Sequence, residues 1–165
     1  MFESTFDVVF RLVNKWVPKK RYMKEEGYRN DLYNYLRENL KKRGTDIFGL
    51  GTSERYVIKK EAGRHLADIG INDEVGIELK LNFKKQSQLD RLVGQIKRFL
   101  QSYRYVIVVL CGELDEGKVD ELRYDFREYE STSEILPPEK IVKIICKTEK
   151  EHLKKKTQGL FDIEF

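Results

Sequence analysis

The chain has 165 residues, of which 40% are apolar and 36% charged, and a formal net charge of +4. This length and composition are typical of a single folded domain, residues 1–165, with a sizeable core and a highly charged surface. No apolar run approaches the roughly 20 residues that span a membrane, and charged residues interrupt the apolar pattern of residues 2–17. We therefore expect a cytoplasmic protein with no signal peptide and no membrane partner.

Apolar residues at helical spacing predict a helix over residues 2–17, and Pro18 separates it from a second predicted helix over residues 19–42. Three runs typical of strands follow: ERYVIKKE (54–61), RHLADIGI (64–71) and VGIELKLNF (75–83). Because Asn-Asp-Glu at 72–74 is a turn sequence, the last two runs are expected to pair as a hairpin.

The second half of the chain alternates helices and strands. The pattern predicts helices over residues 87–102 and 116–130, a strand buried on both faces over 104–111, and a last strand over 140–147. The element order α-α-β-β-β-α-β-α-β predicts an α/β fold of the α+β mixed-sheet kind, with helices flanking the sheet. Cys111 and Cys146 end two of the apolar runs, and we expect both to be reduced and buried.

Charge is distributed unevenly along the sequence. Residues 15–24 contain five bases and no acid, and residues 79–101 contain six bases and one acid. Residues 112–139 reverse the balance, with ten acids and three bases. This asymmetry indicates one electropositive face, although an ordinary solvated surface explains charge alone equally well.

The predicted hairpin places two acids face to face. If the turn is Asn72–Glu74, partner residues have numbers that add to 146, so Asp68 lies opposite Glu78, with Lys80 farther along the same face. The Cβ atoms of such a pair are about 5 Å apart. Two carboxylates this close repel each other unless a proton or a cation lies between them.

A hard divalent cation is the chemical explanation of this pair. Mg²⁺, or Mn²⁺ in its place, is commonly held by one or two carboxylates, water and substrate phosphate. A lysine beside the metal can orient an attacking water or stabilise charge that develops on phosphate. The alternative is an exposed hairpin whose acids are screened by solvent, because this spacing of residues is common.

The sequence ADIGI…IELK, between an acidic helix start and an amphipathic helix with a glutamine, resembles the PD-(D/E)xK nuclease superfamily. The resemblance implies an α-β-β-β-α-β core, the restriction-endonuclease-like fold, over about residues 19–111, with helix 2–17 added before it and an αβ extension, 112–165, after it. It also implies that Asp68 and Glu78 bind the metal and that Lys80 acts on the water. Ala67 stands where the motif has proline.

The resemblance further implies a glutamate on the first core helix and a glutamine on the second. Glu25 precedes Tyr28, Leu32 and Leu36 by 3, 7 and 11 residues, which places it at the sheet-facing stripe. Glu26 is rotated by 100° and is the alternative, and either acid is equally consistent with a helix start. Gln95 lies fifteen residues after Lys80 on a helix flank, as a candidate site residue or as a surface glutamine.

These residues favour a Mg²⁺- or Mn²⁺-dependent nuclease that cuts DNA, with a structure-selective substrate as our expectation. The candidate phosphate contacts are the basic residues around the predicted helix 87–102: Lys84, Lys85, Arg91, Lys97 and Arg98. The alternative is a non-catalytic member of the same fold that binds nucleic acid or protein. Aromatic residues in the first predicted helix leave a homodimer contact open.

Overall fold

A mixed five-stranded sheet forms the centre of the molecule. The structure is a computed structural model and describes residues 3–44, 56–60, 66–130 and 139–148. The strands lie in the order β1 (Ile58–Lys60), β2 (Ile69–Ile71), β3 (Val75–Leu81), β4 (Tyr105–Cys111) and β5 (Ile141–Lys147). β1, β2 and β3 are antiparallel neighbours, whereas β4 and β5 run parallel to β3.

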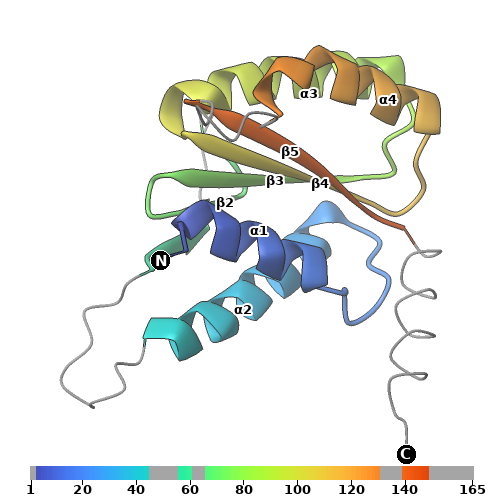
Figure 1. Cartoon of the computed structure of the whole chain (residues 1–165). Helices are drawn as coiled ribbons and strands as arrows, with labels where there is room; N and C mark the ends of the chain where they lie inside the picture. Colours follow the sequence, from blue (N-terminus) through green and yellow to red (C-terminus); the bar gives the residue numbers. More distant parts are fainter. Residues whose placement is uncertain (1–2, 45–55, 61–65, 131–138, 149–165) are drawn as a thin grey trace, which may run out of the picture.

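Helices cover both faces of the sheet, which gives three layers (Figure 1). The first helical layer consists of α1 (Thr5–Lys15) and α2 (Glu25–Gly44), and the second of α3 (Gln86–Ser102) and α4 (Glu116–Asp125). A short 3-10 helix, Arg127–Tyr129, follows α4. The structure confirms the predicted α/β class with a mixed sheet, and the order α2-β1-β2-β3-α3-β4 is the one expected of the core.

Strand β3 separates the two cores by the alternation of its side chains. Val75, Ile77 and Leu79 belong to the core beneath α1 and α2, as the apolar face of this strand predicts. Glu78 and Lys80 therefore extend from the opposite face, the one that α3 and α4 cover. In β4 the side chains of residues 106–111 are buried on both faces, as a parallel strand between two helical layers requires.

The second helix begins at Glu25, and the prediction that it begins near residue 19 is wrong. The cause is Asp31, a buried side chain that accepts hydrogen bonds from Trp16 Nε1, the Lys19 backbone N–H and the Tyr22 hydroxyl. These bonds fix residues 16–22 as a connection across α2. Burial, followed by the bond to Asp31, raises the pKa of Tyr22 to about 12.

Several predicted elements are longer than the observed ones. Of the run 64–71 only Ile69–Ile71 is a strand in the described part, and of the run 54–61 only Ile58–Lys60. The helix expected over 116–130 ends at Asp125 before the 3-10 turn. Residues 1–2, 45–55, 61–65, 131–138 and 149–165 lie outside the described ranges, and with them much of the predicted C-terminal extension.

Cys111 and Cys146 are thiols on the neighbouring strands β4 and β5. Cys111 is buried among the residues beneath α1 and α2, and this burial raises the pKa of its thiol to about 12. Cys146 packs on the other core and is only partly buried, so the prediction of burial holds for Cys111 alone. Among the described helices, none is both long and apolar enough to cross a membrane.

Candidate active site

The β2–β3 hairpin has the register that the sequence predicts. Ile69 pairs with Ile77, Gly70 with Gly76 and Ile71 with Val75, so each pair of numbers adds to 146. Asn72 and Asp73 turn the chain with φ of 55° and 51°, values that Asn and Asp tolerate better than most residues. This register directs Asp68 toward Glu78, one position beyond the last ladder pair.

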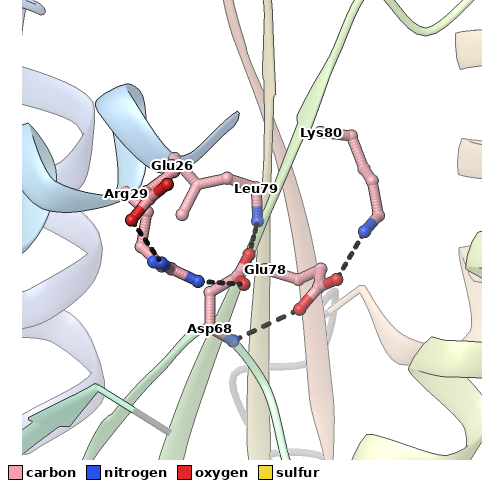
Figure 2. A network of polar contacts seen from close by, with 6 residues as sticks. All are labelled: Glu26, Arg29, Asp68, Glu78, Leu79 and Lys80. Atoms are coloured by element: carbon pink, nitrogen blue, oxygen red, sulfur yellow. Dashed lines mark hydrogen bonds and ion pairs between the residues drawn. The ribbon is translucent and has the colours of Figure 1, made fainter. Parts of the chain in front are cut away.

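The prediction that Asp68 is a strand residue paired across the ladder is wrong. β2 begins at Ile69, and Asp68 lies in a bend immediately before it. Its Oδ2 accepts a hydrogen bond of 2.9 Å from the Leu79 backbone N–H, and its own N–H donates to Glu78 Oε2 at 3.3 Å. Figure 2 shows both bonds: the Asp68 N–H donates to the Glu78 carboxylate, and the N–H of Leu79, the residue after Glu78, donates to the Asp68 carboxylate.

Glu78 is the most buried member of the site. Its side chain is 6% exposed, and its Oε1 accepts a 2.6 Å bond from Lys80 Nζ. Burial, and next the charge of Asp68, raise the pKa of Glu78 above its ordinary value of 4.5, while Lys80 opposes the shift. The carboxylate at Glu78 is thus held in a position where a positive charge is favourable.

Glu25, the preferred candidate for the helix acid, contacts the edge of β3. Glu25 Oε2 accepts a 3.0 Å bond from the Leu81 backbone N–H, two residues beyond Leu79. Backbone N–H groups of alternate strand residues point to the same edge, about 7 Å apart. Asp68 and Glu25 therefore occupy consecutive bonding positions on the part of β3 that β2 leaves unpaired.

Glu26 points away from β3 and instead contacts Arg29. Its Oε1 lies 3.7 Å from Arg29 Nη2, and Arg29 Nη1 lies 3.8 Å from Asp68 Oδ1. In Figure 2, Arg29 and Lys80 lie on opposite sides of the acid pair. The sequence analysis missed Arg29, because nothing in the local pattern of α2 distinguishes it from a surface arginine.

Gln95 projects from α3, the helix that covers the face of Glu78 and Lys80. Its Oε1 is buried and has no hydrogen-bond partner among the described residues. A buried, unpaired amide oxygen is uncommon and calls for an explanation. A ligand that donates a hydrogen bond, such as metal-bound water, is one explanation.

Tyr103 also lies against this face of β3, and the sequence analysis did not include it among the candidate site residues. Its ring lies so close to Gly76 that a Cβ there would come within 2.6 Å of Tyr103 Cδ2. The Tyr103 hydroxyl is buried and has no partner among the described residues. The ring therefore covers Gly76 on the strand face that also carries Glu78, two residues farther along β3.

The predicted phosphate contacts are all exposed, but they do not form one row. They are Lys84, Lys85, Arg91, Lys97 and Arg98. Arg91 and Arg98 lie four residues before and three after Gln95, on the same flank of α3, whereas Lys97 is rotated by 200° from it. Lys84 pairs with Glu113, and this bond lowers the pKa of that carboxyl.

The donor set fits a hard divalent cation in its chemistry. No group of three His, Cys, Asp or Glu side chains converges as a ready-made metal cluster in the described ranges. Mg²⁺ does not need one, because it commonly takes one or two carboxylates and completes its shell with water and substrate phosphate. Asp68 and Glu78 supply that pair, and the unpaired Gln95 oxygen adds an acceptor on the same side of the sheet.

No protein-family model, no curated protein and no solved structure matches this chain.

Proposed function

We propose that this chain is a metal-dependent nuclease that hydrolyses DNA phosphodiester bonds and belongs to the PD-(D/E)xK superfamily. The observation that carries the proposal is the arrangement at Glu78. Its buried carboxylate receives the Asp68 N–H at 3.3 Å and the Lys80 ammonium at 2.6 Å. Two adjoining carboxylates can hold a metal that activates water, and a lysine beside them can stabilise charge on phosphate.

Each residue has a distinct role in this proposal. Asp68 and Glu78 hold Mg²⁺ or Mn²⁺, which when bound polarises phosphate and lowers the pKa of water. Lys80 donates hydrogen bonds to the attacking water or to the developing charge on phosphate. Glu25 and Gln95 accept hydrogen bonds from water near the metal. Arg91 and Arg98, with Lys84, Lys85 and Lys97, contact phosphates and orient the DNA.

The substrate that best suits this chain is DNA recognised by shape. Phosphate contacts carry no sequence information, and the candidate DNA contacts of this chain are exposed basic side chains that suit phosphate. Branched DNA offers phosphates in an arrangement that duplex DNA lacks. The proposal includes a homodimer, since cleavage of two strands at a junction requires two sites. It also includes a cytoplasmic location.

Cleavage of supercoiled plasmid, single strands, duplex and four-way junctions in Mg²⁺ or Mn²⁺ tests the proposal. We expect activity that EDTA abolishes and that Asp68→Asn or Glu78→Gln reduces at least 100-fold, of the size seen when key catalytic groups are removed. Asp73→Asn in the same hairpin is the matched control, because its carboxylate lies at the turn and pairs with Lys59. Undiminished cleavage by Asp68→Asn contradicts the assigned site.

A non-catalytic protein that binds nucleic acid is the second candidate. The observation in its favour is that both acids already have cationic neighbours, Lys80 at Glu78 and Arg29 at Asp68. This candidate predicts salt-dependent DNA binding that needs no divalent cation and produces no cleavage. Binding measured in EDTA alongside the cleavage assay separates the two functions.

A further inference from the structure

Arg29 connects the candidate metal site to the surface of α2. Its guanidinium lies between Asp68 Oδ1, at 3.8 Å from Nη1, and Glu26 Oε1, at 3.7 Å from Nη2. The side chain is 32% exposed, and its Nε is buried with no partner among the described residues. A partly exposed guanidinium, with one buried donor that has no partner among the described residues, therefore lies beside a candidate metal ligand (Figure 2).

The two oxygens of Asp68 have different partners. Oδ2 accepts the fixed Leu79 N–H at 2.9 Å, whereas Oδ1 is the oxygen nearest Arg29. The backbone bond follows from the position of Asp68 at the end of the hairpin. The contact with Arg29 is long and depends on a flexible side chain, so it is the one that a stronger ligand can replace.

A divalent cation and Arg29 compete for the same carboxylate. A positive guanidinium near Asp68 repels a metal ion there and reduces its affinity. The phosphate backbone of DNA offers arginine a bidentate partner that matches its planar fork. When DNA binds at the site, its phosphate therefore replaces Asp68 as the partner of the guanidinium. Asp68 Oδ1 is then available to the metal.

Resting on the nuclease function proposed above, we propose that Arg29 is the counter-ion of Asp68 that couples divalent-metal binding to DNA binding. The free protein binds metal weakly because Arg29 opposes it. DNA strengthens metal binding, and by thermodynamic linkage metal strengthens DNA binding by the same factor. Arg29 thus acts through Asp68 as a positioning residue. Tight metal binding, and with it cleavage, then occurs only when DNA is present.

Metal affinity measured without turnover tests this coupling. Mn²⁺ binding is followed by electron paramagnetic resonance on the full chain, with and without a phosphorothioate four-way junction that resists hydrolysis. For wild type we expect DNA to tighten Mn²⁺ binding about 10-fold, within the usual range of coupling between sites. For Arg29→Gln we expect Mn²⁺ to bind about 10-fold tighter without DNA, and the gain from DNA to shrink correspondingly.

Two further variants separate the charge of Arg29 from its packing. Arg29→Lys keeps the charge and should leave Mn²⁺ affinity in the free protein close to that of wild type. Arg37→Gln removes an exposed charge from the same helix and should change neither affinity nor coupling. A purely structural role for Arg29 predicts instead that both Gln and Lys at position 29 weaken Mn²⁺ binding, which would overturn the proposal.

The outcomes also distinguish this inference from the nuclease proposal. If wild type binds Mn²⁺ at Asp68, as its loss in Asp68→Asn shows, but Arg29→Gln behaves as wild type, only the coupling is wrong. If wild type binds no divalent cation with or without DNA, the coupling and the metal-dependent function are both wrong.

Discussion

Glu25, at the first turn of α2, and Leu81, at the last residue of β3, are joined by a 3.0 Å hydrogen bond from backbone N–H to carboxylate across 56 positions of sequence. This bond ties the start of a helix to the end of the strand that carries Glu78 and Lys80. Neighbouring Glu26 has no such contact with β3 and pairs with Arg29 instead.

The two glutamates therefore differ in their expected effect on activity. Glu25→Gln retains an oxygen that can accept the Leu81 N–H, so the fold should persist while the charge near the proposed metal site is lost. We expect cleavage to fall about 10- to 100-fold, the range seen for residues that support a metal site. Glu26→Gln, one residue away, should change cleavage less than threefold, about 0.6 kcal/mol. Equal losses in both variants contradict the assignment of Glu25.

The stability of the metal-free protein should depend on Glu78 in a defined direction. Burial and the charge of Asp68 raise the pKa of Glu78 in the folded state, so its contribution to stability is present at low pH and lost as pH rises through the folded pKa. Glu78→Gln carries no such charge. Its free energy of unfolding should therefore rise relative to that of wild type as the pH increases above the ordinary glutamate pKa of 4.5.

Urea unfolding in EDTA at several pH values measures this difference. Parallel stability profiles for wild type and Glu78→Gln contradict it. Saturating Mg²⁺ provides an internal control, because a cation that binds only the folded state stabilises wild type and should leave Glu78→Gln unchanged.

Gly76 should be intolerant of a side chain, since a Cβ there would lie 2.6 Å from the Tyr103 ring. We expect Gly76→Ala to lower the free energy of unfolding by about 1–3 kcal/mol, the usual cost of overpacking a core. Gly94→Ala is the matched control: the nearest atom to its Cβ is Arg98 Nη1 at 3.7 Å, within helix α3. That change should raise stability by about 0.5–1 kcal/mol.

A double-mutant cycle assigns the Gly76 effect to the ring. In a Tyr103→Ala background the added methyl group meets no ring, so Gly76→Ala should cost clearly less than in wild type. Thermal or urea unfolding of the four proteins gives the coupling energy. An undiminished cost in the Tyr103→Ala background would place the clash elsewhere.

DNA affinity should depend on which flank of α3 carries a charge. Arg91 and Arg98 share the flank of Gln95, so the double change to Gln should reduce the slope of log affinity against log salt by about 2. Lys97→Gln, on the other flank, should alter that slope by much less. Fluorescence anisotropy with a labelled junction over a salt series measures both, and equal changes would contradict a single DNA-facing flank.

Much of the fold was predictable because it depends on periodic patterns. The apolar alternation of residues 75–81 and the turn at 72–74 were enough to give the register that the hairpin adopts. The start of α2 was not predictable, because Asp31 fixes residues 16–22 by bonds that only the folded chain brings together. Local sequence there, rich in Lys and Arg, is compatible with a helix.

The proximity of Asp68, Glu78 and Lys80 was predictable, but their contacts were not. Asp68, Glu78 and Lys80 follow from spacing along two strands. The bond of Asp68 to the Leu79 N–H depends on the early end of β2, which strand propensity does not reveal. Arg29 was missed because its two acidic neighbours come from different elements, one of them far away in sequence.

The backbone bonds of Asp68 and Glu25 bear on how this protein can change over evolutionary time. Both acids are held by main-chain amides, at positions 79 and 81, that any residue except proline supplies. The side chains at those positions pack in the core beneath α1 and α2, where apolar residues of similar volume can replace one another at little cost in stability. A site anchored by main-chain amides constrains the identity of few residues. The surrounding sequence can therefore diverge widely while the acids keep their positions.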